Sequence, residues 1–228
     1  MHGTRDDILA NLANIREAIA RACARAGRDP SAVSLVAAAK TVPADIVGWA
    51  VEGGVTAIGH NYVKELRDMH DEVAGVRWHF IGTLQASSAH HVAALADVVE
   101  TVAGEKATMR LARRAHDAGR VVDALIEVDL TGARTGVPPD ELGAFADLVA
   151  GLEGLRLRGL MTLPPIPEHA EDARPWFVRL RDHRDRLAER HPQVVELSMG
   201  MSLDYAVAVE EGATMVRIGT ALFGPRTA

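Results

Sequence analysis

Short apolar runs alternate along this chain with longer stretches in which hydrophobic residues recur every three or four positions. Eight of the short runs are rich in β-branched and apolar residues, which is typical of buried strands. They span Val33–Ala39, Val55–Ile58, Arg77–Ile81, Val98–Val102, Val121–Asp129, Leu155–Thr162, Val194–Ser198 and Thr214–Ile218. The hydrophobic pattern therefore predicts eight strands.

The stretches between these runs have helical periodicity, and a further helix is expected in front of them. Thr4 and Asp7 suit the N-terminal cap of that leading helix. Gly27 and Pro30 suit its end, which places it at about Thr4–Ala26. The other predicted helices span Pro43–Val51, Asn61–Ala74, Ala86–Ala94, Glu105–Ala118, Pro139–Ala150, Ala170–Arg190 and Asp204–Glu210.

Strands that alternate with helices imply parallel pairing through right-handed crossovers. Eight such units in a chain of 228 residues predict an α/β fold, a closed (β/α)8 TIM barrel with an additional N-terminal helix. An open doubly wound sheet is the alternative, but no Gly-x-Gly-x-x-Gly turn follows the first predicted strand. No linker rich in Pro, Ser and Gly divides the chain. We therefore expect a single domain over 1–228, with the leading helix in 1–30 and the barrel in 31–228.

The composition of the chain argues against nucleic-acid and membrane partners. Hydrophobic residues make up 48% and charged residues 25% of the chain, and its net charge is −6. A nucleic-acid-binding surface is normally basic, so we expect no nucleic-acid partner. No run of 18 apolar residues occurs, and the first residues do not resemble a signal peptide, so we expect a cytoplasmic protein with no membrane partner. No large apolar stripe is evident, which favours a monomer.

The first predicted strand runs directly into Lys40, where a turn through Thr41 and Pro43 begins. An amine at the mouth of an apolar barrel loses hydration, which disfavours the ammonium form. A neutral amine is a nucleophile toward aldehydes, so this position suits a Schiff-base lysine. The alternative is a lysine that simply begins a solvated loop.

Two glycine-containing loops follow the last two predicted strands, at residues 198–202 and 217–224. Phosphate sites recur at these two places in barrels of this kind, beside the amino end of a short extra helix. Glycines let backbone N–H groups approach a dianion closely, and the hydroxyls of Ser198 and Thr220 can add donors. The alternative is a pair of tight turns that pack the rim of the barrel.

A barrel closes by pairing its last strand with its first, so Lys40 and the predicted phosphate loops become neighbours. A lysine, a phosphate site and a cation together meet the requirements of pyridoxal 5′-phosphate (PLP). Arg217 could face the pyridine nitrogen, where a permanent cation would weaken the cofactor as an electron sink. The alternative for Arg217 is a rim salt bridge with Glu210 or Glu211.

Several stretches carry a family resemblance. They are residues 37–43 (Ala-Ala-Ala-Lys-Thr-Val-Pro), 58–65 (Ile-Gly-His-Asn-Tyr-Val-Lys-Glu), 78–85 (Trp-His-Phe-Ile-Gly-Thr-Leu-Gln), 157–164 (Leu-Arg-Gly-Leu-Met-Thr-Leu-Pro), 197–204 (Leu-Ser-Met-Gly-Met-Ser-Leu-Asp) and 216–224 (Val-Arg-Ile-Gly-Thr-Ala-Leu-Phe-Gly). The chain resembles the pyridoxal phosphate homeostasis proteins, single-domain relatives of the alanine racemase barrel. The resemblance runs from about Ser34 to Arg226.

The resemblance implies that Lys40 holds PLP as a Schiff base and that Arg217 lies at the ring nitrogen. It places Ser198, Gly219 and Thr220 at the phosphate, and two further residues in the pocket lining, Asn61 and His79. Members of this family are regarded as carriers or buffers of the cofactor without established catalysis. Their possible partners are PLP-dependent apoenzymes.

The chain departs from the family pattern at His60, where the family usually has Glu, and at Ser87-Ser88, where an Asn-Lys pair is common. Neither change touches the predicted Schiff-base lysine or phosphate loops. They do bear on any secondary cofactor contact, or on a release step, that depends on those side chains.

A PLP-dependent amino-acid racemase of the alanine racemase type is the alternative function. Racemisation needs an acid/base group on each face of the bound substrate. The relatives that racemise supply the second group, a tyrosine, from an extra β-domain after the barrel. This sequence ends at Ala228, and its only tyrosines are Tyr62 and Tyr205. We therefore expect a carrier rather than an enzyme.

Other candidate sites are weaker. The ten histidines form no His-Glu-x-x-His motif, and the one cysteine, Cys23, shares a helical face with apolar residues, which predicts a place in the core. The loop at residues 132–136 could bind an anion, although a simple turn is the better interpretation because no lysine follows it. No metal site is predicted.

Overall fold

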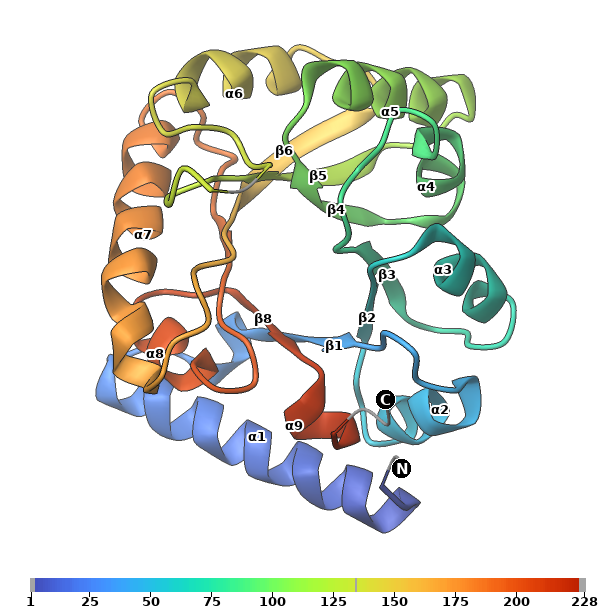
Figure 1. Cartoon of the computed structure of the whole chain (residues 1–228), viewed down its shortest axis with the longest axis vertical. Helices are drawn as coiled ribbons and strands as arrows, with labels where there is room; N and C mark the ends of the chain where they lie inside the picture. The colour runs from blue at the N-terminus through green and yellow to red at the C-terminus, as the bar shows by residue number, and fades with distance from the viewer. Residues whose placement is uncertain (1–2, 134, 226–228) are drawn as a thin grey trace.

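Eight parallel strands pair in chain order and close into a barrel in the computed structural model, which describes residues 3–133 and 135–225. Figure 1 looks into the ring that these strands form. The strands are β1 (Ser34–Ala38), β2 (Ala57–His60), β3 (Arg77–Phe80), β4 (Val98–Val102), β5 (Val122–Glu127), β6 (Leu155–Met161), β7 (Glu196–Ser198) and β8 (Met215–Ile218). All eight predicted strands and the predicted barrel are confirmed.

The helices lie outside the ring of strands (Figure 1). They are α1 (Arg5–Arg25), α2 (Ala44–Glu52), α3 (Val63–His70), α4 (Ala89–Leu95), α5 (Glu105–Asp117), α6 (Leu142–Ala150), α7 (Arg174–Ala188), α8 (Tyr205–Glu210) and α9 (Thr220–Phe223), with short 3-10 turns η1 (Pro30–Ala32) and η2 (Ala170–Ala173). No helix in the described part of the chain combines the length and apolarity that a bilayer span requires.

The additional N-terminal helix, α1, begins as its sequence predicts. The Thr4 hydroxyl accepts from the backbone N–H of Asp7, and the Asp7 carboxylate accepts from the backbone N–H of Thr4, which forms a capping box. One face of α1 is buried, Cys23 included, and the helix lies against α8 and α9 (Figure 1). Each buried Ile or Leu on this face contributes about 1.5–3 kcal/mol. Packing therefore holds α1 against the C-terminal helices α8 and α9, which flank the closing strand β8.

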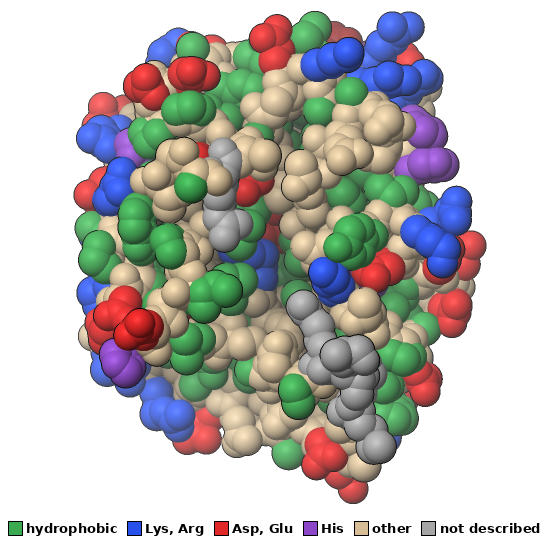
Figure 2. Space-filling view, in the orientation of Figure 1, with side chains coloured by type: hydrophobic (Ala, Val, Ile, Leu, Met, Phe, Trp, Pro, Cys, Tyr) green, Lys and Arg blue, Asp and Glu red, His purple; other side chains and the backbone are tan. Residues whose placement is uncertain are grey.

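The pairing register brings the ends of neighbouring strands together. On one side of β1, Ala37 is opposite Ile218 of β8, and on the other side Ala38 is opposite Gly59 of β2. The residues that follow β8, β1 and β2 therefore lie side by side at one end of the barrel. Side chains of different kinds gather on this face, which is hollowed over the middle of the ring (Figure 2).

Two predicted helices differ most in extent from the structure. The segment predicted as helix Asn61–Ala74 is helical only over α3, which begins after Tyr62 because that residue is extended, with φ −122° and ψ 134°. The segment predicted as Ala170–Arg190 divides into η2 and α7, and Pro175 lies in the first turn of α7, where its missing N–H is not needed. The four-residue helix α9 was not predicted, because it is too short to show periodicity.

Replacement of Gly159 by alanine should show how closely β6 packs on β7. A Cβ on Gly159 in β6 would lie 2.1 Å from the backbone oxygen of Glu196 in β7. We expect Gly159→Ala to lower the free energy of unfolding by about 2 kcal/mol or more. Gly143→Ala in α6 is the matched control, since nothing lies within 4 Å of its Cβ, and it should raise that free energy by about 0.5–1 kcal/mol. Urea denaturation measures both, and equal effects would contradict this packing.

Candidate functional site

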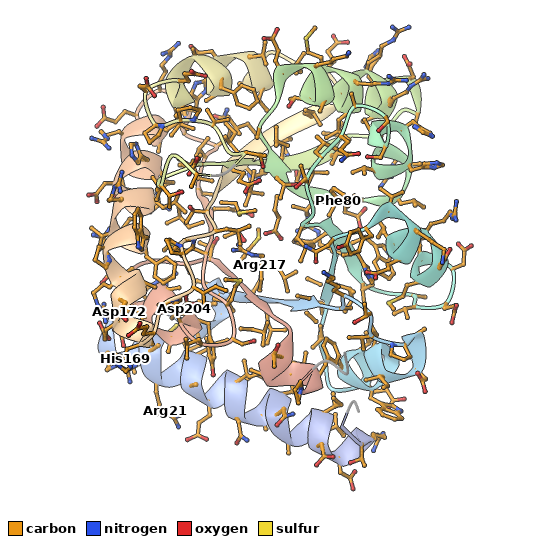
Figure 3. The ribbon with its side chains drawn as sticks, viewed as in Figure 1. Arg21, Phe80, His169, Asp172, Asp204 and Arg217 are labelled. Carbon is orange, nitrogen blue, oxygen red and sulfur yellow. The ribbon has the colours of Figure 1, made fainter. Side chains whose placement is uncertain are left out.

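Arg217 is the central charged side chain of the barrel lumen. It lies on β8, is 4% exposed, and points into the ring of strands (Figure 3). Its Nη1 donates to the hydroxyl of Ser198 at 2.5 Å, and its Nη2 donates to the backbone oxygen of Thr162 at 2.9 Å. Two amino groups of the guanidinium are thus held by residues at the ends of β7 and β6.

A buried carboxylate, Glu100 on β4, continues this hydrogen-bond chain across the lumen. Its Oε2 accepts from the Ser198 hydroxyl at 2.5 Å, and its Oε1 accepts from Nδ1 of His79 at 2.6 Å. Glu100 and Ser198 are fully buried and His79 is 2% exposed. Side chains from β3, β4, β7 and β8 are therefore joined by hydrogen bonds inside the barrel.

The charged groups of this hydrogen-bond network in the lumen stabilise one another. Burial acts to raise the pKa of Glu100, but the hydrogen bond and charge of His79, with the charge of Arg217 and the Ser198 hydrogen bond, hold it below its usual value. Burial lowers the pKa of Arg217, and the charges of Glu100, Glu127 and Asp204 oppose that shift. A guanidinium remains charged under ordinary conditions, so Arg217 is a buried permanent cation.

The alternative role for Arg217, a rim salt bridge with Glu210 or Glu211, is wrong. Glu210 and Glu211 instead pair with Arg174 at 2.7 and 2.5 Å. Arg25 and Arg181 add further ion pairs to this outer cluster. The outer arginines thus join α1, α7 and α8, whereas Arg217 serves the lumen.

Lys40 lies two residues beyond the end of β1 and is half-buried. Its Nζ lies 5.0 Å from the centre of the Tyr62 ring, which belongs to the turn after β2. The next residue, Thr41, has φ +60°, a left-handed conformation that is rare for a β-branched residue. Its hydroxyl donates to the Lys40 carbonyl at 2.7 Å. A tight, strained turn therefore holds this lysine at the rim.

Lys40 is also distinguished from the other lysines of the chain. The sequence contains three, Lys40, Lys64 and Lys106. Lys64 lies on α3 with its side chain 81% exposed and paired with Asp68, and Lys106 lies exposed on α5. Of the three, only Lys40 follows a barrel strand directly.

The loop after β8 approaches the Lys40 turn closely. A Cβ added at Gly219 would lie 3.2 Å from the backbone oxygen of Ala38, so the absence of a side chain permits this approach. Thr220, the first residue of α9, is exposed. The backbone N–H of Ala221 donates to the hydroxyl of Ser202 at 3.1 Å, which ties this loop to the loop after β7.

The two pocket-lining candidates lie in different places. Asn61 directly follows β2 and is half-buried at the rim, where its backbone packs so closely on Gly82 that a Cβ there would lie 1.9 Å from the Asn61 oxygen. His79 lies deeper, in the lumen, on Glu100. The structure thus brings Lys40, Asn61 and the loop at Gly219 to adjacent strand ends.

Ser198 is near Arg217, and its one hydroxyl proton is directed to Glu100. As a phosphate donor it would first have to release that bond. Sequence reasoning missed two residues here. The first is Glu100, the one acid in the run Val98–Val102, and the second is Ser202, the second hydroxyl of the loop after β7.

His60, one departure from the family pattern, lies outside the lumen between β2 and α3. It is fully buried, with Nε2 3.3 Å from the sulfur of Met69 and its ring stacked on Trp78 at 6.0 Å. Its Nδ1 lies 3.7 Å from Oε2 of Glu65, and neither atom has a hydrogen-bond partner among the described residues. Burial lowers the pKa of His60 to about 4. The substitution therefore affects packing behind the site and not its lumen.

The other features singled out in the sequence carry no chemistry here. Ser88 begins α4 and its hydroxyl donates to the backbone oxygen of Gln85. The loop at 132–136 includes Arg134, which lies outside the described residues. In residues 3–133 and 135–225 no group of His, Cys, Asp and Glu side chains could hold a metal ion.

Comparison with known proteins gives consistent similarities. The family model described as alanine racemase, N-terminal domain, matches residues 10–227. A pyridoxal phosphate homeostasis protein of Aquifex aeolicus is 38% identical over 220 residues, covering 94% of this chain and 96% of the relative. A protein of the same name from Escherichia coli (strain K12) is 37% identical over 236 residues, covering 97% of each chain.

A solved structure is similar in both fold and sequence. It is that of PipY of Synechococcus elongatus PCC7942 with PLP bound, with a TM-score of 0.85 and 31% identity. The match covers 95% of this chain and all of that chain (100%). The similarity therefore extends over the whole barrel and is not limited to its loops.

His60 should make the fold sensitive to mild acid. The unfolded ring takes up a proton near pH 6.5 and the folded ring only near pH 4, so stability is lost as pH falls between these values. The loss from this residue should reach about 3 kcal/mol. His60→Gln should remove that part of the pH dependence in urea denaturation. Identical pH slopes for wild type and His60→Gln would contradict the assignment.

Proposed function

This chain belongs to the family of the pyridoxal phosphate homeostasis proteins, and on that premise we propose that it binds PLP and carries or buffers it in the cell. The family resemblance stated from the sequence is confirmed by these relatives. One observation carries the proposal: the pairing of β8 with β1 brings the Lys40 turn beside the loop that begins at Gly219. An amine and a loop of backbone donors thus meet at one rim.

The groups at this rim and in the lumen fit the three functional parts of PLP, which are its aldehyde, its ring and its phosphate. When bound, PLP supplies an aldehyde for attachment to an amine and a ring that accepts electron density. Lys40 is the amine, since the other two lysines are exposed on the outer helices α3 and α5. Its side chain has four rotatable bonds, which allows Nζ to turn from Tyr62 toward the lumen.

Arg217 would face the ring nitrogen from the lumen. Its buried guanidinium is a donor without an acceptor lone pair, so it favours the unprotonated form of a nitrogen placed against it. A ring held in that form is a poor electron sink. This arrangement suits tight retention of PLP and disfavours chemistry that needs a stabilised carbanion.

The backbone N–H groups of Gly219 and Thr220 would hold the phosphate. Gly219 leaves this backbone open toward the Lys40 turn, and the Thr220 hydroxyl is exposed at the rim. Ser198 was also predicted for the phosphate, and Ser202 adds a hydroxyl that already bonds to Ala221. Asn61 and His79 would line the pocket from β2 and β3.

The relatives support a role in PLP supply. They are named as homeostasis proteins rather than as enzymes, which favours a carrier over an amino-acid racemase. We further propose that the chain acts in the cytoplasm as a monomer and gives PLP to PLP-dependent apoenzymes. Its exposed large hydrophobic residues are scattered over separate elements, which supports the monomer.

Borohydride reduction of the PLP-loaded protein tests the site. We expect one label per chain, on the peptide that contains Lys40, because reduction fixes an amine-bound aldehyde in place. Lys40→Ala should abolish the label while the free energy of unfolding changes by less than about 1 kcal/mol, since a rim lysine adds little to the core. Mass spectrometry of the digested protein measures the label.

Lys64→Ala and Lys106→Ala are the matched controls, and both should keep the label on Lys40. A label on either of those lysines, or none in the wild type, would refute the proposed attachment. A racemase assay on a panel of amino acids, run on the same loaded protein, should give no turnover above that of the Lys40→Ala variant. Sustained turnover would favour the racemase instead.

A further inference from the structure

A serine hydroxyl stands between the two buried charges of the lumen. We propose that Glu100 is a positioning residue that holds the guanidinium of Arg217 in one orientation through the hydroxyl of Ser198. We call the two hydrogen bonds that join Glu100, Ser198 and Arg217 the relay; it is a property of the protein without cofactor. Its consequence for PLP rests on the proposed function, in which Arg217 faces the ring nitrogen.

The distances require a relay and not a direct contact. Oε2 of Glu100 lies 3.8 Å from Nη1 of Arg217, which is beyond hydrogen-bond range. Each of these atoms lies 2.5 Å from the Ser198 hydroxyl oxygen. The carboxylate therefore acts on the guanidinium through that hydroxyl and by charge.

The direction of the relay follows from the chemistry of its members. Arg217 can only donate, so the Ser198 oxygen must accept from it. The single proton of that hydroxyl then goes to Glu100, whose two oxygens accept from Ser198 and from His79. Such charge-assisted bonds are stronger than neutral ones.

Two further contacts lock the ends of the relay. Nη2 of Arg217 donates to the backbone oxygen of Thr162, so rotation of the guanidinium would break bonds at both amino groups. Nδ1 of His79 holds the second oxygen of Glu100 and prevents the carboxylate from turning. The lowered pKa of Glu100 agrees with an ionised carboxylate in this network.

Burial makes the relay costly to interrupt. Glu100 and Ser198 have no exposed surface, so water cannot replace a lost partner without entering the lumen. Removal of the Ser198 hydroxyl leaves a guanidinium donor unpaired, and removal of the Glu100 charge takes away a counter-ion that lies 3.8 Å from Nη1 of Arg217. In either case the guanidinium should gain freedom to rotate.

Nuclear magnetic resonance of the Arg217 side chain in protein without cofactor tests the relay directly. In the wild type, Nη1 and Nη2 should give separate signals, because rotation of the guanidinium about the Nε–Cζ bond, which would exchange them, is hindered. Ser198→Ala and Glu100→Gln should merge or broaden them. Ser198→Thr keeps a hydroxyl and should restore separate signals, and Ser202→Ala, a hydroxyl in the neighbouring loop, should leave them unchanged.

Unchanged Arg217 signals in Ser198→Ala and Glu100→Gln would overturn the proposal. If Glu100→Gln does not fold, Ser198→Ala decides alone, because loss of one small hydroxyl is a mild change in volume. Absorbance titration with PLP then gives the consequence: both variants should bind PLP about tenfold more weakly than wild type, with the label still on Lys40.

The outcomes separate this inference from the proposed function. Failure of the wild type to bind PLP would refute the function, while the Arg217 signals would still decide the relay. Weaker PLP binding by Ser198→Ala with unchanged Arg217 signals would overturn the relay and assign Ser198 to the phosphate. Rescue of both readouts by Ser198→Thr supports the relay.

Discussion

The pairing of β8 with β1 is the interaction on which the candidate site depends. It joins segments from opposite ends of the sequence, with Ala37 opposite Ile218, and so places the Lys40 turn beside Gly219. Packing of α1 against α8 and α9 supports that seam from outside (Figure 1). A parallel barrel has no other way to bring its first and last strand ends together. The geometry of the site is therefore a consequence of closure.

The lumen adds a second constraint, since a buried cation is stable only when it is paired. Arg217 meets this condition through Ser198, Thr162 and the charge of Glu100, and each partner comes from a different part of the chain. Removal of one partner from such a network is more harmful than its net contribution suggests. The polar lumen thus ties the position of Arg217 to the correct assembly of four strands.

The local hydrophobic pattern was sufficient to predict the fold, but it could not predict the polar contacts inside the barrel lumen. Apolar runs identified every strand because burial on both faces leaves a clear signature, and capping residues placed α1. Glu100 gave no such signal, because a buried carboxylate is explained only by partners on distant strands. For the same reason, sequence alone could not distinguish the hydroxyl of Ser198, directed to Glu100, from that of Ser202, bonded to the loop after β8.

We propose that PLP is held at the rim between Lys40 and the loop at Gly219, with Arg217 facing it from the lumen. A crystal structure of the protein grown with PLP tests it most directly. We expect continuous density from Nζ of Lys40 to the cofactor, the ring nitrogen against Arg217, and the phosphate on the backbone of Gly219 and Thr220. Density for PLP elsewhere on the protein, or a ring nitrogen that faces away from Arg217, would contradict the account.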